Sequence, residues 1–215
     1  FAVDRTEVVL WHLDRLVAAG RVPSIPVIVD SPMACRALDF YRDEARHGSP
    51  EIRPELHGRE LFTALDLVQT TSADDSKALN DRRGPMVIVS ASGMATGGRV
   101  VHHLANRIGD HRNTVLLAGF QAPGTRGDLL RSGATTLKLL GQYLPVKSKI
   151  VSVDLSAHAD QSELLDWLAT ARSPRIVYVN HGEEDASEVL VGAIEHARHV
   201  PAVAPRAGER VRLNG

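Results

Sequence analysis

The sequence predicts an α/β protein with a mainly parallel sheet flanked by helices, because one pattern recurs along the chain. Five short runs rich in β-branched residues are each followed by a loop of small and polar residues, and then by a segment with helical periodicity. Helical crossovers of this kind connect parallel strands. The predicted strands are residues 27–29, 86–90, 114–118, 150–153 and 175–179.

The first two helices are predicted from apolar spacing and from an end signal. Residues 6–19 form an amphipathic helix, because Val9, Leu13 and Leu16 recur at helical spacing. A second helix begins with Pro32, since proline suits the first helical turn. Helix, strand and helix therefore open the chain.

Later helices are predicted to begin near Arg99, after residues 119–127, after the segment DLSAHAD and after the segment NHGEEDA. Residues 51–83 are polar and weakly periodic, which predicts a solvated insertion with short helices. A softer boundary between two α/β blocks is expected near residues 143–145.

Composition excludes several classes of protein. The formal net charge is -1, so no overall positive field favours a nucleic acid, and any such contact must be local. The single cysteine, Cys35, excludes an intramolecular disulfide and a cysteine-rich zinc knuckle, and it favours a cytoplasmic location. No apolar run approaches the roughly 20 residues that span a bilayer, so no membrane partner is expected. Because the chain starts at Phe1 on an apolar segment, it is predicted to be a fragment.

Loops that follow the strands are the first places to look for a site, because ligands bind beyond the carboxyl ends of parallel strands. Residues 90–98, SASGMATGG, offer hydroxyl groups, glycines and a helix N-terminus, which together can bind an anion. The alternative is a tight turn that merely requires glycine. Residues 119–127 suggest the same chemistry more weakly. Neither loop contains a dinucleotide or Walker-type motif.

Two histidines, His158 and His181, each follow a predicted strand and lie 23 residues apart, about one strand-loop-helix repeat. They are expected to project from neighbouring strand ends into one crevice. Imidazole is a common zinc ligand and a proton donor near neutral pH, although a structural hydrogen-bonding role is the alternative. Asp160 and Glu163 predict a capping box, which is a structural role. The histidines at positions 102, 103, 196 and 199 are predicted to be surface residues on helices.

The ordered segments VIVDSPMA, VIVSASGMATGGR, GFQAPGTRG, VDLSAHADQSELLDWL and VYVNHGEEDA resemble the β-CASP branch of the metallo-β-lactamase superfamily. This family includes the endonuclease subunit of the pre-mRNA cleavage and polyadenylation machinery and prokaryotic RNA-processing nucleases. The resemblance implies that His158 contacts the scissile phosphate and acts as general acid. It also implies that His181 ligates one of two zinc ions.

The resemblance implies two parts. Residues 1–142 are expected to form the β-CASP domain, and residues 143–215 the C-terminal portion of a metallo-β-lactamase αββα domain. Two departures from the family pattern stand out: the chain contains no HxHxDH motif, and Asp128 follows Gly127 where the family often has arginine. Because a catalytic zinc needs about three protein ligands, the isolated chain is expected to be metal-poor and inactive.

For the parent protein the resemblance implies zinc-dependent hydrolysis of single-stranded RNA, and a homodimer is plausible. The alternative is a non-catalytic module that binds RNA or a protein partner, while a small-molecule metallohydrolase is disfavoured by the β-CASP segments. The candidate ligands for RNA phosphates are Ser31, Ser92, Gly93, Met94, Gly97, Gly98, Thr125 and Ser156.

Overall fold

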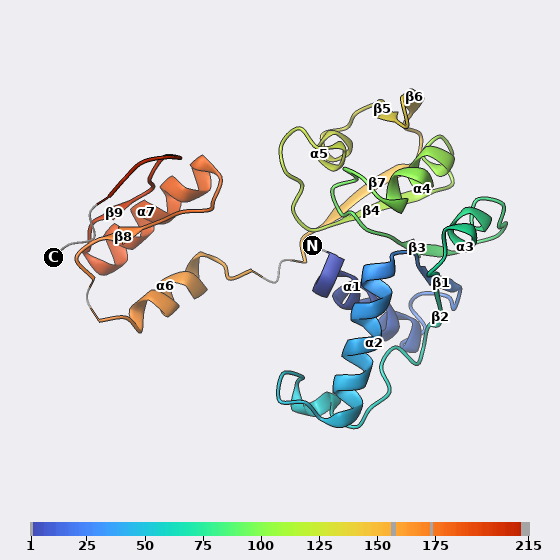
Figure 1. Ribbon diagram of the computed structural model, residues 1–215, viewed down its shortest axis with the longest axis horizontal. Helices are drawn as coiled ribbons and strands as arrows, with labels where there is room; N and C mark the ends of the chain where they lie inside the picture. Colours follow the sequence, from blue (N-terminus) through green and yellow to red (C-terminus); the bar gives the residue numbers. More distant parts are fainter. Residues whose placement is uncertain (1, 156–157, 173, 212–215) are drawn as a thin grey trace. The chain divides into compact units, whose positions relative to one another are not determined.

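The computed structural model describes residues 2–155, 158–172 and 174–211 (Figure 1). The chain divides into two compact units, Phe1–Ala157 and His158–Gly215. Each unit is an α/β arrangement of its own, and each is described separately below.

A three-stranded parallel sheet of order β2-β1-β3 forms the first half of unit 1. All three β-branched residues of the central strand are buried, and Val27 and Val29 pack in one core cluster with Leu10 and Leu38. Helices α1 and α2 lie side by side against this sheet (Figure 1). The elements are α1 (Ala2–Ala18), β1 (Pro26–Val29), α2 (Pro32–His47), the 3-10 turn η1 (Pro54–Leu56), β2 (Asp66–Gln69), α3 (Ala73–Ala78) and β3 (Val87–Val89).

The second half of unit 1 has its own core around a parallel pair, β4 and β7, and an antiparallel hairpin, β5–β6. Leu137 and Leu139 alternate with exposed neighbours along β5, so one face of the hairpin is buried. The elements are α4 (Arg99–Arg107), β4 (Thr114–Ala118), α5 (Arg126–Arg131), β5 (Thr136–Leu139), β6 (Gln142–Pro145) and β7 (Lys149–Val153).

Unit 2 is small, and its core among the described residues centres on Ile194 and Ala202. Strands β8 and β9 form a parallel pair, with α7 as the crossover between them. The elements are α6 (Gln161–Ala169), β8 (Val177–Tyr178), α7 (Glu184–Arg198) and β9 (Ala202–Val203).

The predicted α/β class and the five strand-loop-helix repeats are confirmed. Residues 51–83 differ from the prediction of a plain solvated insertion, because they contain β2, which pairs with β1. Hairpin β5–β6 and strand β9 were not predicted either. No helix within the described ranges is long and apolar enough to cross a membrane.

Candidate functional site

The glycine-rich loop at residues 90–98 connects β3 to the start of α4, and two of its glycines differ in what the fold requires. Gly98 has φ 76°, and a Cβ added there would lie 3.0 Å from the Ala91 carbonyl oxygen, so the turn itself requires glycine. At Gly93 and Gly97 φ is not positive, and a Cβ would meet no described heavy atom within 4 Å. The packing of the described residues therefore does not explain why these two positions are glycine.

Two side chains hold the glycine-rich loop in place: Gln121, from the loop after β4, and Arg126, the first residue of α5. The Gln121 Nε2 group donates to the carbonyl oxygens of Gly93 at 3.2 Å and Gly119 at 3.1 Å. The Arg126 Nη1 group donates to the carbonyl oxygens of Ala95 at 3.0 Å and Thr96 at 3.1 Å. Both residues belong to the segment 119–127, for which the sequence suggested anion binding, and their side chains instead bind backbone of the glycine-rich loop.

Two predicted phosphate ligands cap helices. The Ser31 hydroxyl accepts a hydrogen bond from the Ala34 N–H at 3.4 Å at the start of α2. The Thr125 hydroxyl accepts from the Asp128 N–H at the start of α5 and donates to a carbonyl oxygen. Their roles as phosphate ligands stay predictions, and helix capping is the role that these contacts support.

Asp128 places a carboxylate where the family often has arginine. Its Oδ1 accepts from the Arg131 guanidinium at 2.9 Å, and its Oδ2 accepts from the Gly124 N–H at 3.1 Å. The hydrogen bond from Arg131, followed by that from Gly124, lowers the pKa of Asp128. Asp128 thus already accepts from the Gly124 N–H, so this N–H group is not available to a phosphate.

A buried polar network surrounds Asp30, at the carboxyl end of β1, and its extent was not predicted. The Asp30 side chain is fully buried and accepts hydrogen bonds from four side chains of other elements. The donors are Thr70 at 2.5 Å, Ser76 at 2.6 Å, His103 at 2.5 Å and Arg99 at 2.6 Å.

The charge of Asp30 is maintained by these donors. Burial raises the pKa of Asp30, but the hydrogen bonds from Ser76, Thr70, His103 and Arg99 together outweigh it, so the pKa lies below its usual value. Arg99 is the first residue of α4, and the Ser90 hydroxyl donates to the Asp30 carbonyl oxygen at 2.9 Å. Asp30 therefore anchors both ends of the glycine-rich loop.

The network corrects one prediction. His103 is 7% exposed and bonds Asp30, so it is not a surface residue, whereas His102, His196 and His199 are exposed as predicted. His103 contacts Asp30 through its Nε2 atom, and it lies between the buried residues Val101 and Leu104 of α4.

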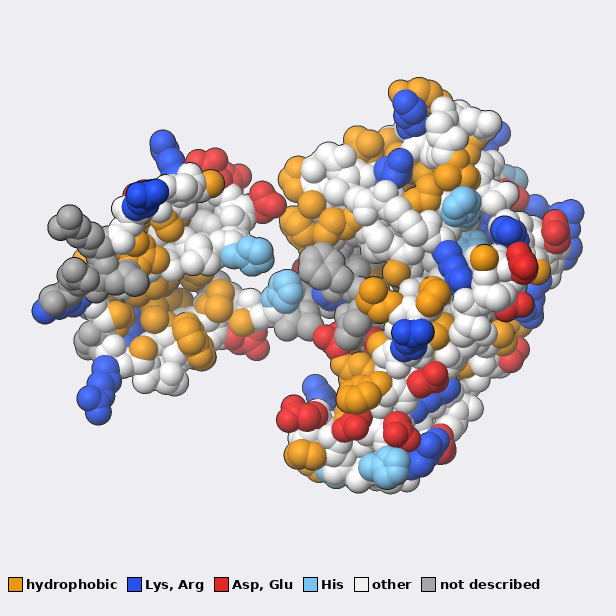
Figure 2. Space-filling model, in the orientation of Figure 1, with side chains coloured by type: hydrophobic (Ala, Val, Ile, Leu, Met, Phe, Trp, Pro, Cys, Tyr) orange, Lys and Arg blue, Asp and Glu red, His pale blue; other side chains and the backbone are white. Residues whose placement is uncertain are grey.

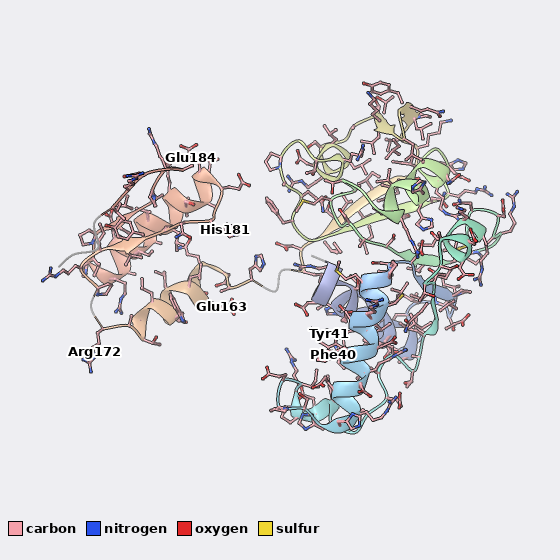
Figure 3. All side chains as sticks on the ribbon, viewed as in Figure 1. Phe40, Tyr41, Glu163, Arg172, His181 and Glu184 are labelled. Atoms are coloured by element: carbon pink, nitrogen blue, oxygen red, sulfur yellow. The ribbon has the colours of Figure 1, made fainter. Side chains whose placement is uncertain are left out.

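His158 and His181 both lie in unit 2 and are both exposed. His181 occupies the connection between β8 and α7 with φ 66° (Figure 3). The strands before the two histidines belong to different units: β7 pairs with β4 in unit 1, and β8 pairs with β9 in unit 2. The expectation that the histidines project from neighbouring strand ends stays a prediction. Ser156 lies outside the described residues.

Asp160 and Glu163 have the predicted structural role. Asp160 Oδ1 accepts from the Glu163 N–H at 2.9 Å, and Glu163 Oε2 accepts from the Asp160 N–H at 2.8 Å. This reciprocal capping box starts α6, so it accounts for both carboxylates without a ligand.

A zinc centre needs several donors in one place. Within the described part of the chain, no group of three or more His, Cys, Asp or Glu side chains is arranged to hold a metal ion. His181 can supply one imidazole, but the described residues do not fit a complete zinc site.

Comparison with known proteins decides the family. The Beta-Casp domain profile matches residues 6–130, more than half of the chain. The chain belongs to the β-CASP family. A second profile, described as the Zn-dependent metallo-hydrolase RNA specificity domain, matches residues 143–205 of this β-CASP chain. The second match begins where the predicted second domain begins, whereas the compact units divide after Ala157, so the domain boundary stays a prediction.

Three relatives of the β-CASP chain have informative names. A ribonuclease of Thermus thermophilus is 39% identical over 86% of this chain and 42% of its own length. An RNase J-like protein of Methanocaldococcus jannaschii is 27% identical over 97% of this chain and 48% of its own length. Integrator complex subunit 11 of Gallus gallus is 34% identical over 87% of this chain and 30% of its own length. The chain spans less than half the length of each of these relatives.

Proposed function

We propose that this chain is the β-CASP and RNA-specificity part of a zinc-dependent ribonuclease that hydrolyses phosphodiester bonds in single-stranded RNA. The observation that carries the proposal is the succession of the two profile matches, the second of which is described as a zinc-dependent RNA specificity domain. The relative named ribonuclease supports the same activity.

The glycine-rich loop is proposed to bind RNA phosphates. The N–H groups of Thr96, Gly97 and Gly98 have no hydrogen-bond acceptor among the described residues, and they precede the positive end of α4. The absence of side chains at Gly93 and Gly97 leaves room for a phosphate to approach the backbone. An unpaired RNA backbone can follow such a loop, which favours a single-stranded substrate.

His158 is proposed to donate a proton to the leaving oxygen, the role that the family resemblance implies for it; its side chain is exposed, and imidazole is the side chain most often used as a general acid. We propose that His181 supplies one zinc ligand and that the remaining ligands come from other residues of the full-length protein. Bound zinc would supply a nucleophilic hydroxide and stabilise charge at the phosphate. A cytoplasmic location and a homodimer are part of the same proposal.

The test compares three histidine variants of the full-length protein. We expect His181→Ala to lose zinc by elemental analysis, and His158→Ala to keep zinc but lose RNA cleavage. His196→Ala, an exposed histidine of α7, is the matched control and should retain both properties. Normal cleavage by both His181→Ala and His158→Ala would refute the proposal. RNA binding without zinc or cleavage in the wild type would favour the non-catalytic module.

A further inference from the structure

A hollow of about 330 Å³ lies beside hairpin β5–β6, within unit 1. This volume is at the lower end of the range of small-ligand sites, about 300–1,000 Å³. Thr96 of the glycine-rich loop reaches its rim, so the hollow adjoins the loop proposed to bind phosphate. The lining residues are Thr96, Gly124, Thr125, Arg126, Leu129, Leu137 and Lys138.

Two cations line this hollow without a carboxylate partner among the described residues. Arg126 donates only to carbonyl oxygens, including that of Lys138 at 2.8 Å. The Lys138 ammonium lies 5.6 Å from the centroid of the Tyr143 ring, the residue opposite it across the hairpin. The acid of α5, Asp128, is already paired with Arg131. The hollow therefore has positive charge that an anionic ligand can neutralise.

The sequence segment that contains Lys138 is also rich in positive charge. Between Asp128 and Asp154 the chain has four cationic residues and no acidic residue, although its net charge is -1. Figure 2 shows Lys or Arg side chains beside hydrophobic ones where Figure 1 places β5 and β6, with no acidic side chain next to them on this face. The cations in this segment are Arg131, Lys138, Lys147 and Lys149.

Apolar surface and an exposed aromatic ring accompany the charge. Leu129 is 46% exposed and lines the hollow, and Tyr143 is 72% exposed. A phosphate needs only cations and N–H groups, whereas a nucleobase also needs an apolar or aromatic surface. A nucleotide combines both requirements.

We propose that this hollow binds one nucleotide of single-stranded RNA, next to the glycine-rich loop. The phosphate of this nucleotide contacts the Lys138 ammonium, which lies over the Tyr143 ring. The base packs against the exposed side chain of Leu129. The inference rests on the proposed function for the identity of the ligand as RNA. It adds a separate binding site that extends the RNA path from Thr96 to the hairpin.

The test measures binding of a fluorescein-labelled single-stranded RNA to the full-length protein by anisotropy, with EDTA present so that the RNA stays intact. We expect Lys138→Ala to weaken binding about three- to tenfold. The slope of log affinity against log salt concentration should fall by about 0.7, the value for one lost phosphate contact. Lys138→Arg should restore both values. Lys77→Ala, an exposed lysine of α3, is the matched control and should bind like the wild type.

A second variant tests the apolar part of the hollow. Leu129→Glu places a negative charge there, and we expect it to weaken RNA binding at least as much as Lys138→Ala without lowering the midpoint of thermal unfolding. Wild-type affinity and salt slope in Lys138→Ala would overturn the proposal. If Lys138→Ala weakens binding of AMP but not of RNA, the ligand is a free nucleotide and the RNA assignment is wrong.

Failure of the two proposals can be told apart. If only the proposed ribonuclease activity is wrong, neither the wild type nor any variant cuts RNA when zinc is present. Lys138→Ala then still binds RNA more weakly than the wild type does. If only the hollow is assigned wrongly, the wild type cuts RNA and Lys138→Ala binds RNA unchanged.

Discussion

Replacing Asp30 by asparagine removes a charge from the centre of a buried network without changing the side chain's shape. Breaking a buried ion pair by removing one partner costs about 3–5 kcal/mol. Arg99 is 20% exposed and keeps the carbonyl oxygens of Thr70 and Thr71 as acceptors, so we expect the lower end, about 3 kcal/mol. For a domain of this size, that corresponds to a fall of roughly 6–12 °C in Tm.

The assay is urea unfolding of the 215-residue chain, followed by tryptophan fluorescence. Trp11 packs against the core of unit 1, whereas Trp167 is 72% exposed, so Trp167→Phe leaves a single reporter for that core. Asp74→Asn is the control, because Asp74 forms only an exposed pair with Lys77, and its effect should stay within about 0.5 kcal/mol. Equal effects of Asp30→Asn and Asp74→Asn would refute the reasoning.

The stability difference between the wild type and Asp30→Asn should depend on pH. The pKa of Asp30 in the folded state lies below its usual value near 3.8, so the network's contribution to stability is present above that value. It is lost as the pH falls through the folded-state pKa. The difference in free energy of unfolding between wild type and Asp30→Asn should therefore stay constant down to about pH 5 and shrink as the pH falls further, through 3.8 and the lower folded-state pKa. A constant difference would show that the carboxylate charge is not what stabilises the network.

Two further predictions follow from local packing. Gly127→Ala should destabilise the chain by about 1–3 kcal/mol, because the new Cβ would lie 1.6 Å from Gln121 Oε1. Gly192→Ala in α7, whose Cβ would meet no described atom within 4 Å, should instead stabilise the chain by about 0.5–1 kcal/mol. Urea unfolding of both variants checks this, and equal effects would contradict the packing argument. Asp160→Ala should lower stability by about 1 kcal/mol through loss of the cap that pairs with Glu163, and an unchanged urea midpoint would show that the box contributes nothing.

Strands with a clear run of apolar residues were predictable from the sequence, whereas a short edge strand with few apolar residues was not. Strand β1 is central and fully apolar, whereas β2 lies at a sheet edge and has only Leu67 and Val68 between polar residues. Hairpin β5–β6 did have a signal, the alternation of Leu137 and Leu139 with polar residues before Gly141.

The Asp30 network could not be predicted because its side-chain donors are distant in sequence. They lie between 40 and 73 residues from Asp30. One signal for His103 was present: it lies three residues after Val100 and next to the buried Leu104 of the helix. By contrast, the capping box of Asp160 and Glu163 was predictable, because all its partners lie within one turn.

The glycines at 93, 97 and 98 imply two kinds of mutational tolerance within one loop. A selection that asks only for folded, soluble chain should reject side chains at Gly98 and accept small ones at Gly93 and Gly97, because only Gly98 has positive φ and a close backbone neighbour. If the loop binds RNA phosphates as proposed, a selection for RNA processing should reject side chains at all three positions. The loop thus offers an internal comparison by which a library screen could separate the sequence demands of folding from those of function.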